Sequence, residues 1–474
     1  MKNLTLLLMF ISIVGCAVNP VTGKQDFVII SENEEIAMGR EYNAQILRKN
    51  SIYQDQELQD YVQAIGESLA SKSHRPNLIY RFTILDSPDV NAFALPGGYI
   101  YINRGLMSYL SSEEELAAVL GHEIGHVTAR HSVKQYSQSQ LMSILSTAIE
   151  IKAGSTAGNI ANLASGALLS GYGREMELEA DELGAEYISE DGYSPQGMYD
   201  VLSVLKDQEV YSKEIAKQRG QEPTSYHGVF ASHPSNDKRL QEVIDNVSIL
   251  NPKEKSKKKD NYLSKIDGMT FGDSEQSGIR RGDEFYHGPL NFFISCPETW
   301  EIINLPNQLI FSSPYGQAVL QMTLEDLNFK ETPKDYLERF VSNFFEEEEL
   351  KKNGLDGYTA IIRKSGRLSR IAIIFKGDKV YRFIGTLEDK DSDINQYDSR
   401  FLKIINSFRE LTQEEQELSK PLRLKTYLVK NGDTYESLAE DSSINTNAED
   451  QLRLLNGDYP DKKLNIGRMI KIVK

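Results

Sequence analysis

Cysteine, positive charge and long apolar runs are all scarce in this sequence of 474 residues. Its two cysteines, Cys16 and Cys296, are too few for a disulfide framework, so apolar cores must hold the folded parts together. After the first fifteen residues no stretch reaches about 18 uncharged apolar positions, which excludes a later transmembrane helix. The 69 acidic residues outnumber the 53 basic ones, and the net charge of −16 argues against a nucleic acid as the main partner.

The start of the chain has the features of a bacterial export signal. Lys2 supplies a positive charge, and the apolar run Leu4–Val14 is too short to span a bilayer. The run leads into Ile13-Val14-Gly15-Cys16, which resembles a lipobox. We therefore predict a lipoprotein signal peptide over residues 1–15 and a lipid anchor on Cys16. The alternative is a simple secretory signal with a chance cysteine. Ala17 after the cysteine indicates the outer membrane, facing the periplasm.

The rest of the chain divides into three folded parts and a linker, which predicts a multidomain α+β protein. Residues 16–250 indicate a mainly helical domain with a strand-rich insert, and residues 251–275 a charged linker. Residues 276–412 indicate an α+β domain in which we expect a helix over Pro333–Lys352. This domain has no titratable cluster with the spacing of a metal or nucleophile site. Residues 420–474 have the order strand, helix, helix, strand.

A helix that begins near Ser112 has a metal-binding face. Ser112 and Glu115 form a capping box, and a wide apolar stripe predicts that the helix is buried. His122 and His126 are four residues apart, so their imidazoles project from one face and can bind one zinc ion. Glu123 lies beside them, where it can act as general base. The alternative is a core helix that happens to contain two histidines.

A second helix offers the third ligand that decides between these alternatives. Residues 174–192 indicate this helix, and Glu177 and Asp181 lie four residues apart on it, so both face the same way. One carboxylate can bind zinc while the other accepts a hydrogen bond from a ligand histidine and fixes its tautomer. Glu179 points elsewhere on the helix and is the weaker candidate. Two matching pieces on two helices favour a zinc peptidase.

Together these motifs resemble one peptidase family over residues 16–245. Besides the two helices, the matching segments are Asn19–Lys24, Asn91–Gly98 and Ser232-His233-Pro234. The chain resembles the lipoprotein, BepA-like branch of the family that holds the Ste-type prenyl proteases, HtpX and the mitochondrial Oma-type proteases. The resemblance implies a mainly helical zincin domain of the minigluzincin type, and it makes residues 276–412 an accessory domain of the kind appended to this branch. Because the transmembrane helices of the prenyl proteases are missing here, prenylated substrates are not expected.

The resemblance also implies roles for individual residues. It makes Glu177 the third zinc ligand, Glu123 the general base, and Asp181 a neighbour of the ligands that is sometimes described as a proton donor. For His233 it implies an active-site role, either stabilising the oxyanion or capping the zinc at rest. Without the resemblance, the sequence around His233 indicates a surface histidine in a loop.

The strand around Tyr99, Ile100 and Tyr101 is a candidate for substrate binding. We expect it to be an edge strand whose free backbone groups pair with an extended polypeptide. The alternative is an ordinary hairpin strand.

The last segment resembles a LysM module. The turn Asn431-Gly432-Asp433-Thr434 lies between its first strand and first helix, and Asn456-Gly457 ends the second helix. The resemblance implies binding of peptidoglycan or a similar N-acetylglucosamine polymer. A LysM-like fold without sugar binding is the alternative.

We therefore expect a zinc-dependent endopeptidase of the bacterial cell envelope that cleaves misfolded or unassembled envelope proteins. Its cofactor would be one zinc ion, and it would be attached to the membrane through its lipid. A chaperone-like protein, or a peptidoglycan-bound scaffold with low or gated proteolysis, is the alternative. The complete set of His122, Glu123, His126 and Glu177 argues against a dead site, but not against slow activity.

Overall fold

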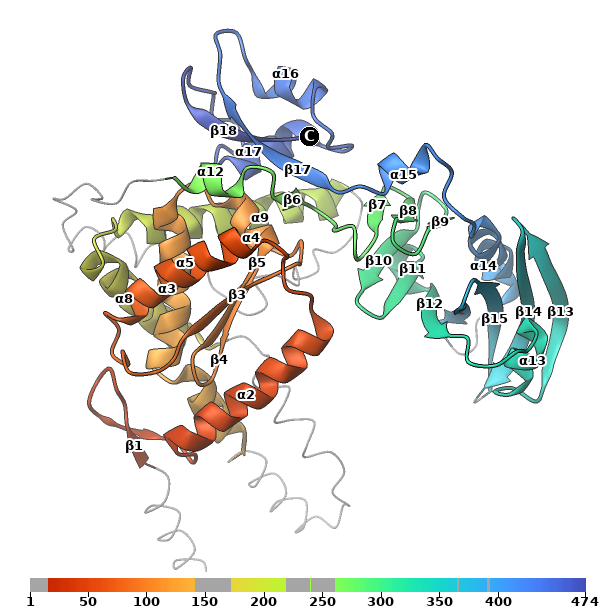
Figure 1. Ribbon diagram of the computed structural model, residues 1–474, viewed down its shortest axis with the longest axis horizontal. Coiled ribbons are helices and arrows are strands. Elements are labelled where there is room, and N and C mark those ends of the chain that lie inside the picture. The colour runs from red at the N-terminus through yellow and green to blue at the C-terminus, as the bar shows by residue number, and fades with distance from the viewer. Residues whose placement is uncertain (1–15, 141–171, 219–238, 240–260, 365, 390–392) are drawn as a thin grey trace, which may run out of the picture. The chain divides into compact units, whose positions relative to one another are not determined.

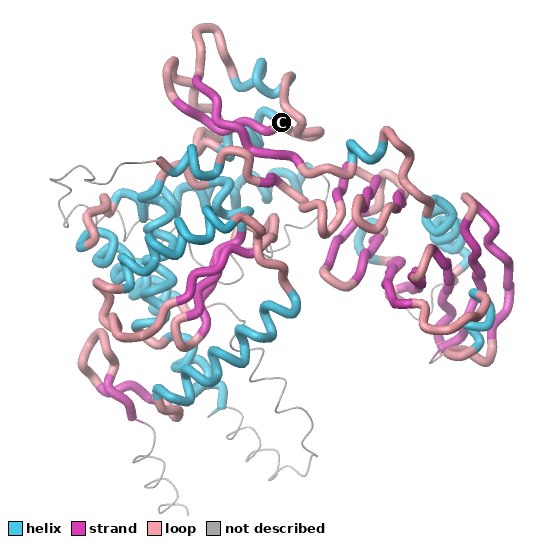
Figure 2. The backbone as a smooth tube through the Cα atoms, in the orientation of Figure 1, coloured by secondary structure: helices cyan, strands magenta, loops and turns pink. Residues whose placement is uncertain are grey.

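A computed structural model describes residues 16–140, 172–218, 239, 261–364, 366–389 and 393–474. The predicted signal peptide, residues 251–260 of the predicted linker and His233 lie outside the described residues. The described residues form two compact units. Unit 1 contains the residues up to Phe271 together with Arg423–Lys474, and unit 2 is Gly272–Leu422. Helices predominate in unit 1 and strands in unit 2 (Figure 2), in agreement with the predicted mixture of α and β structure.

Unit 1 contains the elements of the predicted helical domain and of the C-terminal segment (Figure 1). In chain order they are β1 (Cys16–Val18), β2 (Gln25–Phe27), α2 (Glu32–Lys49), α3 (Gln56–Ala70), β3 (Arg81–Leu85), β4 (Ala92–Leu95), β5 (Tyr99–Asn103), α4 (Arg104–Tyr109), α5 (Glu113–Thr128), α8 (Arg174–Glu190), α9 (Gln196–Gln218), α12 (Tyr262–Ile266), β6 (Thr270–Phe271), β17 (Leu422–Leu428), α16 (Tyr435–Glu440), α17 (Ala448–Leu455) and β18 (Met469–Val473). Within the described ranges, no helix is both long and apolar enough to cross a membrane.

The small sheet of unit 1 corrects the expected position of the substrate strand. Its strand order is β3-β5-β4, with β5 parallel to β3 and antiparallel to β4. The strand that contains Tyr99, Ile100 and Tyr101 is therefore central, and all of its residues are buried. Because a backbone neighbour lies on each side, β5 has no free edge for a substrate, and this prediction is wrong. The edge strand beside it is β4.

Glycines allow α5 and α8 to approach each other closely. A Cβ on Gly125 would lie 2.9 Å from the backbone oxygen of Ala180, and one on Gly184 would lie 2.8 Å from the backbone nitrogen of His122. Any larger residue at these positions would push the helices apart. Close packing at this crossing brings the side chains of α8 within reach of the α5 histidines.

The C-terminal segment packs into unit 1. Strand β17 pairs with β18 on one side and with β6 on the other, forming one three-stranded sheet. Lys471 of β18 is buried, and its Nζ donates to the backbone oxygens of Ser108 (2.9 Å) and Leu110 (2.5 Å), at the end of α4. Tyr459 donates to Glu214 of α9. The predicted order of strand, helix, helix, strand is present, and this segment shares a compact unit with the helical domain.

Unit 2 consists mainly of antiparallel strands. A three-stranded sheet has the order β7 (Ile279–Arg281), β8 (Glu284–His287), β9 (Phe292–Ser295). A seven-stranded sheet has the order β10-β11-β12-β16-β15-β14-β13, in which the strands are β10 (Glu301–Leu305), β11 (Gln308–Ser312), β12 (Ala318–Asp326), β16 (Lys379–Leu387), β15 (Arg367–Lys376), β14 (Leu355–Lys364) and β13 (Phe344–Lys352). The helical elements are η1 (Pro314–Gly316), α13 (Pro333–Glu338), α14 (Asn395–Ser407) and α15 (Glu415–Leu418). Phe401, Ile404 and Ile405 of α14 belong to the same core cluster as the apolar side chains of the large sheet.

The helix expected over Pro333–Lys352 is only partly present. Thr332 caps α13 in a capping box with Asp335, and the helix ends at Glu338. The residues from Phe344 onward form β13, an edge strand that pairs with β14. Pairing with the sheet therefore overrides the high helix propensity of the glutamates in this segment.

Candidate metal centre

The two histidines of α5 direct their Nε2 atoms at one another. The N-cap of α5 is Ser112, whose side chain accepts a hydrogen bond from the backbone of Glu115. One turn separates His122 from His126, and their Nε2 atoms are 2.9 Å apart. Both side chains are buried at this point, with exposures of 6% and 1%. A cation bound by the Nε2 lone pairs of two neutral imidazoles would stabilise this arrangement.

Glu177 of α8 completes a three-ligand cluster with these histidines. Its carboxylate oxygens lie 3.6 Å from the Nε2 of His122 and 3.5 Å from the Nε2 of His126. Tetrahedral bonds of about 2.0–2.1 Å to one zinc ion would separate ligand atoms by roughly 3.3 Å, close to these distances. The donor set of two histidines and one carboxylate is also a set that catalytic zinc uses. The three predicted ligands therefore converge, and they fit one zinc ion.

Asp181 contacts His122; the spacing in α8 predicted such a contact for one of its two carboxylates, and the resemblance assigned it to Asp181. Its Oδ1 lies 2.8 Å from the Nδ1 of His122. A carboxylate only accepts hydrogen bonds, so Nδ1 carries the proton and Nε2 is left with a lone pair for the metal. Burial alone would raise the pKa of Asp181, but the charge of Arg239, together with His122, holds it well below its usual range.

Arg239 is a part of the site that the sequence analysis missed. Its guanidinium forms two hydrogen bonds of 2.7 Å with Asp181, and its Nη1 lies 2.9 Å from Glu177. All three side chains are at most 3% exposed. The arginine therefore orients both carboxylates and offsets part of their charge. A signal for it did exist, because two buried carboxylates one helical turn apart require a positive partner.

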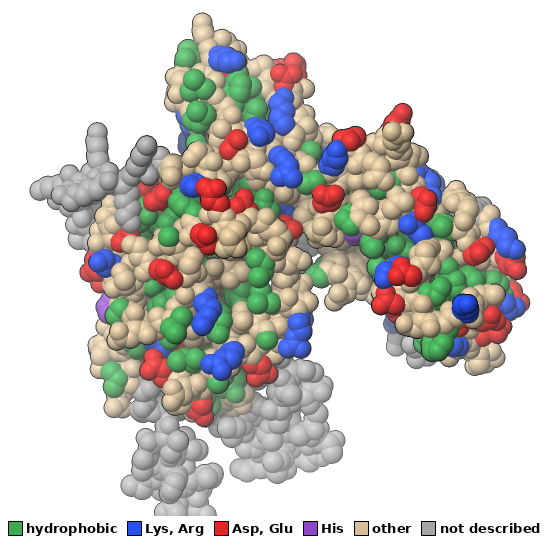
Figure 3. All heavy atoms as spheres, in the orientation of Figure 1, with side chains coloured by type: hydrophobic (Ala, Val, Ile, Leu, Met, Phe, Trp, Pro, Cys, Tyr) green, Lys and Arg blue, Asp and Glu red, His purple; other side chains and the backbone are tan. Residues whose placement is uncertain are grey.

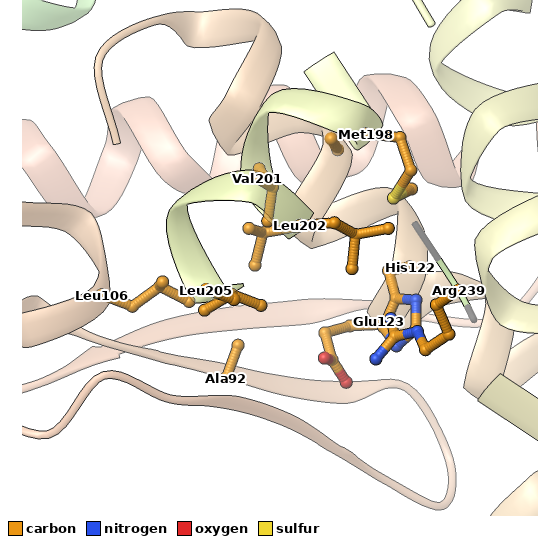
Figure 4. Close-up of a pocket in the computed structure, with 11 residues that line it drawn as sticks. Ala92, Leu106, His122, Glu123, Met198, Val201, Leu202, Leu205 and Arg239 are labelled. Carbon is orange, nitrogen blue, oxygen red and sulfur yellow. The ribbon is translucent and has the colours of Figure 1, made fainter. Parts of the chain in front are cut away.

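Glu123 lies at one end of a pocket beside this cluster. Figure 4 shows Glu123, His122 and Arg239 at that end, while the other walls are apolar. Those walls come from the edge strand β4 and from helices α4, α5 and α9, with Ala92, Leu106, Ala118, Val119, Met198, Val201, Leu202 and Leu205. The carboxylate that the sequence predicts as general base thus faces a space next to the metal ligands. The charges fit as well: when ionised, Glu123, Glu177 and Asp181 outweigh Arg239 by two negative charges, which one zinc ion would neutralise.

Further groups contact His126. The ring of Tyr172 stacks on its imidazole with a centroid distance of 4.0 Å, and the hydroxyl of Tyr172 pairs with Ser132. His131 lies against its other ring nitrogen, 2.8 Å from Nδ1, and Glu179 follows at 3.0 Å from His131. Spacing along one helix does not reveal these contacts. His233 falls outside the described residues, so its role stays a prediction.

Comparison with known proteins agrees with this geometry. Residues 56–246 match the model of Peptidase family M48, a range that contains α5 and α8. The "Beta-barrel assembly-enhancing protease" of Yersinia pestis is 28% identical over 272 residues, which is 54% of this chain and 53% of that protein. The protein of the same name from Escherichia coli K12 is 27% identical over 248 residues, covering 50% of this chain and 48% of its own length.

A mitochondrial protein is also similar. The "Mitochondrial metalloendopeptidase OMA1" of Arabidopsis thaliana is 29% identical over 150 residues, which is 31% of this chain and 30% of that protein. The chain spans about half the length of the first two curated relatives that it matches.

Proposed function

We propose, from the match of residues 56–246 to Peptidase family M48, that the chain is a zinc-dependent endopeptidase of the bacterial cell envelope. The observation that carries the proposal is the convergence of His122, His126 and Glu177 on one point, beside Glu123. A bound zinc ion would polarise the scissile carbonyl and make water a stronger nucleophile. The protein groups around it then have separate tasks.

Glu123 handles protons in this mechanism. Its carboxylate takes a proton from the attacking water and gives it to the amine that leaves, which a positioned carboxylate can do within one turnover. Asp181 keeps the proton of His122 on Nδ1. Arg239 holds the carboxylates of Asp181 and Glu177 in place by direct contacts. Apolar side chains around the pocket limit the access of bulk water, which strengthens these electrostatic interactions.

We propose that the substrate lies extended along β4. Among the described residues, this strand has a sheet neighbour only in β5, which leaves its other edge for backbone pairing. Ala92 of β4 lines the pocket together with Glu123. An extended backbone is exposed in misfolded or unassembled proteins and concealed in folded ones. Together with the names of the bacterial relatives, this supports envelope proteins that have failed to assemble as the substrates.

Two attachments would keep the peptidase in the cell envelope. A lipid on Cys16 would anchor it in the outer membrane. The test is labelling with palmitate, which the wild type should incorporate and Cys16→Ser should not. The LysM-like segment would bind peptidoglycan. The test is binding of the chain to purified sacculi.

Charged side chains of both signs are interspersed on the face of the molecule in Figure 3. This distribution and the net charge of −16 support a role without nucleic acid.

The alternative, a chaperone-like or scaffold protein with little proteolysis, is less well supported. A protein that only holds clients needs neither a buried general base nor a full set of metal ligands. Burying three carboxylates and a guanidinium would destabilise such a protein without benefit. The intact cluster therefore favours the enzyme.

The test of the proposed function is Glu123→Gln. An amide cannot accept the proton of water, so cleavage of casein should fall by roughly 10²–10⁴-fold. The zinc content of the purified variant should equal that of the wild type, because Glu123 is not one of the three ligands. Glu114→Gln, the same change near the start of α5, is the matched control and should leave both quantities unchanged. A Glu123→Gln protein with wild-type turnover would show that the mechanism is wrong.

A further inference from the structure

His131 lies directly behind His126 because α5 stops at Thr128. On a continuous helix, a residue five positions later would be rotated by roughly 140° and could not face the same imidazole. Arg130 instead adopts a left-handed backbone conformation with φ of 56°, and residues 131–140 begin a new helix. Such a conformation is unfavourable for arginine and persists only where its surroundings hold it. Here the buried carboxylate of Glu35 binds the Arg130 side chain at 2.8 Å.

The hydrogen bonds behind His126 allow only one arrangement of protons that is compatible with a metal. His126 needs the lone pair of Nε2 for the metal, so its proton must be on Nδ1 and must be donated to the Nδ1 of His131, 2.8 Å away. His131 then carries its own proton on Nε2. That proton has an acceptor, since Glu179 Oε2 lies 3.0 Å from this nitrogen. In the opposite arrangement, His131 donates to His126, and the Nε2 of His126 is protonated and cannot bind.

Glu179 is the group that selects between these two arrangements. A carboxylate accepts hydrogen bonds and cannot donate them, so it fixes the proton of His131 on Nε2. His131 is fully buried, whereas the side chain of Glu179 is 29% exposed, so the chain of hydrogen bonds runs outward from the metal centre. His122 has a shorter version of the same support, because Asp181 contacts it directly.

We propose that Glu179 and His131 are positioning residues that fix the tautomer and orientation of His126 and thereby set the affinity of the site for zinc. The inference rests on the proposed zinc site and extends it to a second pair of residues outside the ligand set. Outer hydrogen-bond partners of this kind are typically worth 10–100-fold in metal affinity. The expected loss on removing His131 is therefore about 10–100-fold in the dissociation constant of zinc.

The experiment measures zinc affinity by competition with a chelator, with every variant made in the Glu123→Gln background so that no cleavage occurs. His131→Phe retains an aromatic ring but has no acceptor, and zinc binding should weaken by about 10–100-fold. His131→Asn retains an acceptor near the position of Nδ1 and should regain most of the affinity. Glu179→Gln should weaken zinc binding when His131 is present and have no effect beside His131→Asn. Glu182→Gln, an exposed position on the same helix, is the control.

The outcomes separate this inference from the proposed function. If the Glu123→Gln parent binds no zinc, the proposed function fails. If the parent binds zinc and His131→Phe binds it equally well, only the positioning role is refuted. Equal losses in His131→Phe and His131→Asn would refute it too, because the imidazole would then act by its volume alone. Should His131→Phe fail to fold, the dependence of the Glu179→Gln effect on His131 still decides the question.

Discussion

The two units of this protein differ in the side chains that fill their interiors. In unit 1 the described residues bury a charged cluster, in which Glu123, Glu177, Asp181 and Arg239 are each at most 3% exposed. The described core of unit 2 is instead filled with aromatic and aliphatic side chains, including Phe292, Phe311, Phe383, Phe401 and Phe408. Burying charges is costly unless they are paired or hold a metal. The difference indicates that unit 1 gives up stability for chemistry, whereas unit 2 is built for packing.

The units also differ in how the chain forms them. Unit 2 is one continuous stretch, whereas unit 1 combines two stretches that lie on either side of it in the sequence. Leu424 of β17 exchanges hydrogen bonds with Gly268 and Met269, just before β6. Unit 2 is thus an insertion between two neighbouring segments of unit 1, and the matched peptidase region 56–246 is only part of its own compact unit.

Two deletions, one in each unit, should give the largest difference in activity. Removing residues 423–474 should abolish zinc binding and casein cleavage, because it takes Lys471 and the strands β17 and β18 away from unit 1. Replacing residues 272–422 by a short Gly-Ser linker should leave both intact, since the two ends that it joins are already adjacent. Zinc content and turnover of the two purified proteins test this. An active protein without residues 423–474 would show that the C-terminal segment is a dispensable domain.

Lys471 should carry a large part of that effect. Burial lowers the pKa of Lys471, the negative charge of Glu115 opposes this shift, and burial raises the pKa of Glu115 in turn. Lys471→Met removes the donor to two backbone oxygens at the end of α4, and hydrogen bonds to charged groups contribute about 1.5–3 kcal/mol each. Unit 1 should therefore lose roughly 3–6 kcal/mol of stability in calorimetry.

Two measurements sharpen this comparison of the units. Lys425→Met, at an exposed position of the neighbouring strand β17, should change the stability of unit 1 little. Trp300 is the single tryptophan of the chain and lies in the core of unit 2, so its fluorescence reports the unfolding of unit 2. That transition should be unaffected by Lys471→Met. A shift of the Trp300 transition in this variant would contradict the independence of the two units.

The metal-binding helices could be predicted because their signals are local. Four-residue spacing decides which side chains share a helical face, and this alone brings His122 near His126 and aligns Glu177 with Asp181. The two buried carboxylates indicate that a positive partner exists, but no local pattern identifies Arg239 as that partner. It is 58 residues away from Asp181 in the sequence, and only the folded chain brings its guanidinium to the two carboxylates.

The order of the strands in the small sheet and the end of α5 at Thr128 could not be predicted from the sequence either. The turn between β4 and β5 is visible in the sequence, but the parallel neighbour β3 on the far side of β5 comes from a longer connection with no local pattern. Helix periodicity continued past Thr128 would place His131 away from the ligand face, so its contact with His126 cannot be read from the spacing. The left-handed conformation of Arg130 depends on Glu35, a partner 95 residues earlier.

The smallest expected effect concerns the acid sensitivity of unit 2. Burial lowers the pKa of His287 in β8 to about 4, and its Nδ1 accepts a hydrogen bond from the backbone of Leu290 at 3.3 Å, which requires the neutral ring. Between pH 6.5 and 4 the unfolded chain therefore binds a proton that the folded unit does not. The contribution of the neutral His287 ring to the free energy of unfolding of unit 2 is present above pH 6.5. It is lost as the pH falls towards 4, by at most about 1.4 kcal/mol per pH unit.

His287→Gln removes this titration, so the stability of unit 2 should depend less steeply on pH in that range. Urea unfolding followed by Trp300 fluorescence at several pH values between 7 and 4 measures the slope for the variant and the wild type. Glu415, whose pKa is lowered to about 2 mainly by Arg409, loses its contribution in a more acidic range, below the usual carboxylate pKa of about 4.3, so it does not obscure the result. Equal slopes in the two proteins would mean that the imidazole of His287 is hydrated in the folded unit.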